Sequence, residues 1–119
     1  MERTDPSRIR QHLHQLRGER YQLEEQLLEI RALVRGSLVE NWTLSGGRRR
    51  PEAAFYVSRV EDERRRLAYV RRSTLDKVRA LVEAYRRYQR GLRRLRVLSR
   101  GILQALGQLR ESLDAGVKP

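Results

Sequence analysis

Few residues of this chain could catalyse a reaction or hold a metal ion. The only histidines, His12 and His14, are two positions apart, and on a helix such residues point in different directions. The chain has no cysteine, which excludes disulfides and thiolate metal sites. The adjacent acids Glu61, Asp62 and Glu63 are more typical of a solvated turn than of a cation site. We therefore expect no metal, no cofactor and no enzymatic activity.

Arginine is the functional side chain that this sequence supplies in quantity. The chain holds 25 arginines and only 2 lysines, and its formal net charge is +12. Residues 64–100 contain 14 basic and 2 acidic side chains, so this segment carries the whole net charge. Concentrated positive charge repels itself and attracts anions. The sequence therefore predicts a polyanionic partner, DNA or RNA.

The elements that must position these arginines are long helices. Apolar residues recur at alternating intervals of three and four from Thr74 to Leu113, which predicts a helix over 73–115 that opens at a capping sequence, Ser73 to Asp76. Seven arginines fall on the face opposite this apolar seam: Arg79, Arg86, Arg87, Arg90, Arg93, Arg94 and Arg100. They cover about 31 Å, close to one turn of duplex DNA. A solvated face is the alternative, but solvated faces usually mix charges, so we favour phosphate contact.

An earlier helix is predicted over 6–35. Asp5 and Pro6 form a suitable start, and apolar residues from Ile9 to Val34 follow the same spacing. If the two helices pair antiparallel, one register aligns both seams and sets Leu27 opposite Leu81 and Leu16 opposite Leu92. Arg20 then lies opposite Tyr88, either stacked on the ring or simply reaching solvent.

This register leaves the end of the second helix without cover from its own chain. The uncovered segment is 101–115, with the apolar residues Ile102, Leu103, Leu106, Leu109 and Leu113. We expect these side chains to be buried against a second copy or another protein. The alternative is a bend at Gly101 that packs the chain back on itself.

Between the helices the apolar period changes to two. Residues 38–44, 53–60 and 67–70 read as strands, separated by turn residues, within a β segment over 36–72. We predict a mainly α (α+β) fold of one domain over 1–119. It is an antiparallel long-helix coiled-coil hairpin with a three-stranded antiparallel β meander inserted between the helices.

Further arginines lie near the predicted sheet. They form three clusters, Arg48, Arg49 and Arg50 in the first hairpin loop, Arg64, Arg65 and Arg66 after the second turn, and Arg71 and Arg72 before the second helix. Aromatic residues lie among them and could stack unpaired bases. Trp42 and Phe55 fit a small core better, whereas Tyr56 lies on the strand face opposite Phe55 and is the stronger candidate for stacking.

Several segments of the chain are similar to a known family. These are Gly36 to Glu40, Trp42-Thr43, Phe55 to Arg59, Tyr69-Val70, and Val78-Arg79 with Tyr85-Arg86-Arg87. They resemble a family of small prokaryotic proteins without assigned activity, some of them encoded near mobile elements. The resemblance implies a long helix, a β segment and a second long helix. The cysteine motif of that family is replaced here by Ser45-Gly46-Gly47, so a metal-binding role does not transfer.

The sequence also bears on the class of protein. No run approaches the roughly 20 apolar residues of a membrane helix, and the start of the chain does not resemble a signal peptide. We expect a cytoplasmic protein, associated with the nucleoid or with ribonucleoprotein, that binds nucleic acid with low sequence specificity and forms a homodimer or hetero-assembly. The alternative is a coiled-coil adaptor that docks on an acidic protein. A third hypothesis, that the basic helix lies on an anionic membrane, has less support, because the first helix already covers the apolar seam that would have to enter the membrane.

Overall fold

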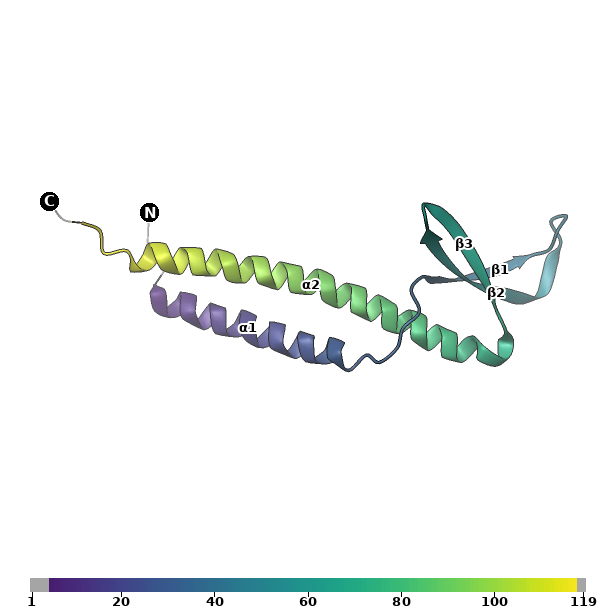
Figure 1. Cartoon of the computed structure of the whole chain (residues 1–119), viewed down its shortest axis with the longest axis horizontal. Helices are drawn as coiled ribbons and strands as arrows, with labels where there is room; N and C mark the ends of the chain where they lie inside the picture. Colours follow the sequence, from purple (N-terminus) through teal and green to yellow (C-terminus); the bar gives the residue numbers. More distant parts are fainter. Residues whose placement is uncertain (1–4, 118–119) are drawn as a thin grey trace. The chain divides into compact units, whose positions relative to one another are not determined.

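The computed structural model describes residues 5–117 and confirms the predicted order of helices and strands. The elements are α1 (Pro6–Leu28), β1 (Ser37–Thr43), β2 (Arg49–Glu61), β3 (Arg64–Val70), a short 3₁₀ helix (Arg72–Thr74) and α2 (Leu75–Leu113) (Figure 1). The chain divides into two compact units. We call Met1–Glu29 with Gln89–Pro119 the helical unit, and Ile30–Tyr88 the sheet unit.

Helix α1 begins where the sequence predicts and ends seven residues early. The Asp5 carboxylate accepts a hydrogen bond from the Ser7 N–H at 2.9 Å, and Pro6 occupies the first helical position. The predicted end at residue 35 is wrong, because the helix stops at Leu28. Val34 belongs to the sheet unit, where its N–H donates to the Leu81 carbonyl at 3.0 Å and its side chain packs on the sheet core.

In the helical unit, α1 runs antiparallel to the second half of α2 (Figure 1). Leu98 is the most buried large side chain, at 1% exposure, although it lies outside the predicted seam. The residues that α2 buries here are Ile102 and a line at intervals of seven whose members are mostly small: Gly91, Leu98 and Ala105. Small side chains let two helix backbones approach closely. The seam of α2 is therefore rotated. The line through Gly91, Leu98 and Ala105 replaces the predicted line through Leu92 and Leu106, whereas Ile102 and Leu109 of the predicted seam stay packed against α1.

The predicted register between the helices is also wrong. A Cβ on Gly91 would lie 2.7 Å from Leu27 Cδ2, and a Cβ on Gly101 would lie 3.4 Å from Leu16 Cδ1. Each α1 residue thus meets a residue nine or ten positions later on α2 than predicted. The extended chain after Leu28 accounts for the shift, because an extended residue advances about 3.3 Å and a helical residue only 1.5 Å.

This register corrects the predicted overhang. Ile102 is buried in a cluster with Ile9, Leu13 and Ala105, and Leu109 packs against that cluster. Helix α2 passes through Gly101 without ending, so the alternative of a bend there is wrong too. Three of the predicted residues remain exposed: Leu103, Leu106 and Leu113.

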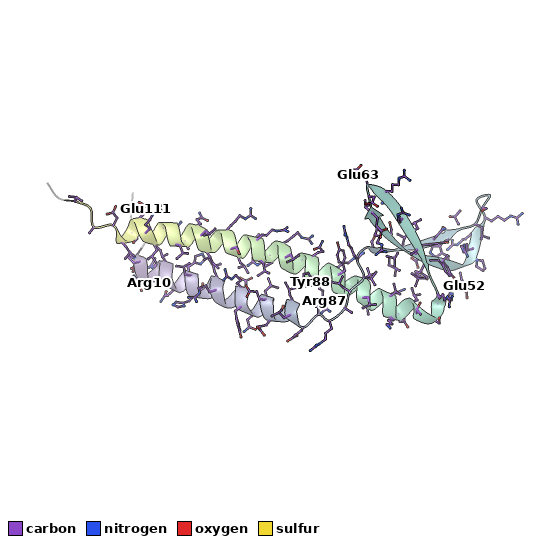
Figure 2. The ribbon with its side chains drawn as sticks, viewed as in Figure 1. Arg10, Glu52, Glu63, Arg87, Tyr88 and Glu111 are labelled. Carbon is purple, nitrogen blue, oxygen red and sulfur yellow. The ribbon has the colours of Figure 1, made fainter. Side chains whose placement is uncertain are left out.

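The sheet unit holds the predicted antiparallel meander in the order β1-β2-β3. A two-residue turn, Asp62-Glu63, joins β2 to β3, and Glu63 lies at the tip of this hairpin (Figure 2). Gly36 enters β1 with φ +138°, and a Cβ there would lie 2.7 Å from the Ser58 carbonyl oxygen, so only glycine fits.

One face of the sheet packs against the first turns of α2. Val57, Val70 and Val82 form the buried cluster. The partly buried side chains that pack on it are Val34, Leu38, Phe55, Leu75 and Val78. We call this the inner face of the sheet. The interpretation of Phe55 as a core residue is consistent with this packing.

Candidate nucleic-acid interface

In the helical unit, three arginines of α2 point away from α1. Arg93 and Arg100 were predicted on this face, and Arg96 joins them because of the rotated seam. Each side chain is exposed, and none forms an ion pair with any carboxylate in residues 5–117. We call Arg93, Arg96 and Arg100 the arginine stripe.

Arg94 does not lie on the face predicted for it. Its Nε and Nη2 atoms lie 2.8 and 2.6 Å from Glu19 Oε1, so the guanidinium links α2 to α1. Charge-assisted contacts of this kind hold a side chain in place. Arg94 therefore contributes to the pairing of α1 and α2. Arg90 is exposed in the same unit.

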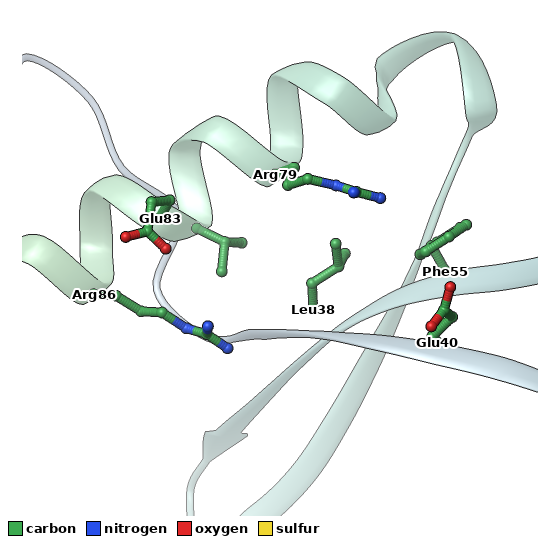
Figure 3. A pocket seen from close by; sticks show the side chains of 7 residues that line it. Leu38, Glu40, Phe55, Arg79, Glu83 and Arg86 are labelled. Atoms are coloured by element: carbon green, nitrogen blue, oxygen red, sulfur yellow. The ribbon is translucent and has the colours of Figure 1, made fainter.

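In the sheet unit, Arg79 and Arg86 lie beside the sheet rather than opposite the packed face. They line a cleft of about 490 Å³ between α2 and strands β1 and β2. Figure 3 shows both side chains leaving α2 toward the strands, and the Arg79 Cζ lies 5.7 Å from the centroid of the Phe55 ring. Glu40 and Glu83 also line this cleft. Two carboxylates balance the two guanidinium groups, so the cleft does not offer a net positive charge to a phosphate.

The arginine clusters around the sheet are partly committed to internal contacts. Arg72 forms an ion pair with Glu52 at 3.1 Å and donates to the Ala53 carbonyl, and Arg66 lies 3.5 Å from Glu61. The remaining members are less constrained. Arg48, Arg64, Arg65 and Arg71 are exposed and without an ion pair among the residues described, and Arg50 is half-buried. Arg87 of α2 is likewise exposed and has no ion pair within residues 5–117.

Trp42 is not the core residue that the sequence favoured. Its side chain is 41% exposed, and the Arg49 Cζ lies 5.3 Å from the centroid of its ring. The β1–β2 loop brings the two together, with the Leu44 N–H donating to the Arg48 carbonyl at 2.7 Å. A guanidinium over an indole is a cation–π contact.

Tyr56 lies on the outer face of the sheet, as expected, and there it meets Tyr69, another of the aromatic residues that lie among the arginine clusters. Register places Tyr56 directly opposite Tyr69, and the two ring centroids are 5.7 Å apart at an interplanar angle of 68°. Both strands were predicted, but the pairing register that brings these rings together was not.

No metal site or membrane helix adds to this picture. The described residues contain no group of three His, Cys, Asp or Glu side chains that could hold a metal ion. Within residues 5–117, no helix has the length and apolar content to cross a bilayer. No family model, curated protein or solved structure matches the chain. The resemblance to small prokaryotic proteins therefore stays a prediction.

Proposed function

We propose that the protein is a nucleic-acid-binding accessory protein that contacts phosphates through arginine and has low sequence specificity. The arginine stripe carries this proposal. Its three guanidinium groups stand within about 10 Å on one helix, and no carboxylate of residues 5–117 forms an ion pair with them. Guanidinium binds phosphate with two parallel hydrogen bonds. Exposed like charges that are held close together repel each other and destabilise the folded protein unless a bound anion compensates them.

The test compares two triple variants with the same net charge. The first replaces Arg93, Arg96 and Arg100 with Gln. The control replaces Arg20, Arg59 and Arg110 with Gln, since each of these forms an ion pair with a nearby glutamate. Fluorescence anisotropy on labelled duplex DNA at several salt concentrations gives the affinity and its salt slope.

The stripe variant should lower the slope of log K against log salt by about 2 to 3, because each phosphate contact contributes about 0.9. The control should keep the wild-type slope. Equal losses in the two variants would show that overall charge, rather than this surface, governs binding. No binding by the wild type at low salt would refute the proposal.

We also propose that a second copy of the chain covers the exposed leucines of α2, Leu103, Leu106 and Leu113. Beside Leu106, the side chains of Leu13 and Ile102 line a hollow of about 400 Å³. These leucines equally favour the alternative function, an adaptor that docks on an acidic protein. In that case the stripe variant would leave the adaptor interaction intact, whereas polar substitution of Leu106 would abolish it.

A further inference from the structure

The outer face of the sheet combines exposed aromatic and aliphatic side chains. Alternation along the strands and the pairing register place Val39, Tyr56 and Tyr69 in one row across all three strands. The next row holds Ser37, Ser58 and Leu67. Tyr69 is 63% exposed, and Val39, Val60 and Leu67 are exposed as well. Soluble proteins seldom leave such a row uncovered unless it binds something.

The arrangement of the two tyrosines suits a stacking ligand. Their edge-to-face packing at 5.7 Å holds each ring in place through the other. Tyr69 lies on the edge strand β3, so its ring is accessible from outside the sheet. Ser58, in the next row of the central strand, is buried at 7% exposure, so the open surface of this face lies at Tyr69 and Leu67 on the edge strand. A planar group could therefore lie against Tyr69 without displacing a core side chain.

Charge decides between the possible ligands. The outer face carries no acidic residue between Ala54 and Val60 of β2 or at the positions of β1 and β3 that pair with them. The nearby acids Glu40 and Glu61 lie on the inner face. Arg65, opposite Val60, lies on the outer face. The sheet unit as a whole has 15 basic and 7 acidic residues, a net charge of +8. Such a surface favours a planar ligand that is also a polyanion.

We propose that the outer face of the sheet is a binding platform for unpaired nucleotides, with Tyr69 and Tyr56 stacking on bases and Arg65 contacting the phosphate chain. This inference rests on the proposed function and specifies the strand state of its ligand. Bases within a duplex are already stacked and hide their flat faces, so only single-stranded segments can use these rings. Stacking on an aromatic side chain tolerates any base, in line with low sequence specificity.

The test uses the full chain and three labelled probes, two single strands of 20 units and one duplex of 20 base pairs. These are oligo(dT), a chain of the same length and charge made of abasic deoxyribose phosphate units, and a 20-base-pair duplex. The main variant is Tyr69→Ala. Tyr69→Phe keeps the ring, and Tyr21→Ala removes a tyrosine of matching exposure, 60%, from α1 in the helical unit.

Tyr69→Ala should weaken oligo(dT) binding by about 5- to 150-fold, the range that corresponds to loss of one base stack. Its affinity for the duplex and the abasic chain should stay within about twofold of wild type. Tyr69→Phe and Tyr21→Ala should retain wild-type oligo(dT) affinity. Circular dichroism confirms that each variant is folded.

The possible failures are distinguishable. If Tyr69→Ala binds oligo(dT) as well as wild type does, or loses affinity for all three probes alike, the platform is refuted. Duplex binding through the arginine stripe would then still stand. If the wild type binds none of the probes at low salt, both the platform and the proposed function fail.

Discussion

Gly91 and Gly107 occupy interior positions of the same helix, but only Gly91 has a close neighbour. Alanine in a helix is favoured over glycine by about 1 kcal/mol, so Gly107→Ala, with no atom within 4 Å of the added methyl group, should stabilise the protein by about that amount. At Gly91 the methyl group would lie 2.7 Å from Leu27 Cδ2 and 3.2 Å from its Cγ. Because Leu27 is buried, overpacking of about 1 to 3 kcal/mol should outweigh the helix preference.

Urea unfolding of the two alanine variants measures the difference. We expect a higher midpoint than wild type for Gly107→Ala and a lower midpoint for Gly91→Ala. A rise for both variants would mean that Leu27 can move aside and that the close helix approach at Gly91 is not required.

The same small residues explain which site arginines the sequence could predict. Hydrophobic periodicity weights large side chains, so it selected the line through Leu92 and Leu106. The packed line passes through Gly91, Leu98 and Ala105. This rotation by one position brings Arg94 in toward Glu19 and sends Arg96 out to solvent. The presence of a basic helix face was predictable, but the identity of its members depended on glycine and alanine contacts that no periodicity measures.

At the scale of elements, the β2–β3 turn contains one residue, Glu63, that does not favour its backbone conformation. Asp62 and Glu63 have φ values of 50° and 63°, the left-handed region that a two-residue hairpin of type I′ requires. Glycine adopts this conformation at little cost, whereas glutamate does not. We expect Glu63→Gly to stabilise the protein by about 1 kcal/mol.

Thermal or urea unfolding tests this expectation, with Glu40→Gly as the matched control. Glu40 lies inside β1, where its φ is negative, so the same substitution there should destabilise the strand. If Glu63→Gly also lowered the stability, the left-handed backbone conformation of Glu63 would not be a source of instability.

The boundary of α1 shows why element limits were harder to predict than the elements themselves. Val34 continues the three-and-four spacing of the helix, so the sequence pattern included it. In the structure it fills the core of the sheet unit instead, next to Val82. An apolar side chain can pack in the seam between the helices or in the core of the sheet unit, and periodicity alone cannot distinguish the two. The strands, their order and the start of α1 were predictable because local turn and capping residues specify them.

At the scale of the whole molecule, charge along α1 bears on how two copies could meet. Residues 6–17 contain three arginines and no acid, whereas residues 18–29 contain four glutamates and one arginine. An antiparallel approach of two α1 helices would set each half against the opposite charge of its partner. The exposed Leu106, beside Arg10 and Arg17 of α1, would enter the same contact. Burial of apolar residues would supply affinity, and charge would set orientation.

We therefore expect a homodimer in sedimentation velocity experiments at tens of micromolar. Leu106→Gln with Leu113→Gln should shift it to monomer, whereas Val97→Gln, a substitution on α2 at nearly the same exposure as Leu106, should not.

Charge reversal on α1 tests the orientation of the two copies. Changing Glu24 and Glu25 to Arg should weaken the dimer by placing like charges together. Adding Arg10→Glu and Arg17→Glu to that variant should restore it, since the antiparallel partner then again presents opposite charges. A monomeric wild type would rule out self-association, and failure of the second pair to restore the dimer would rule out the antiparallel α1 contact.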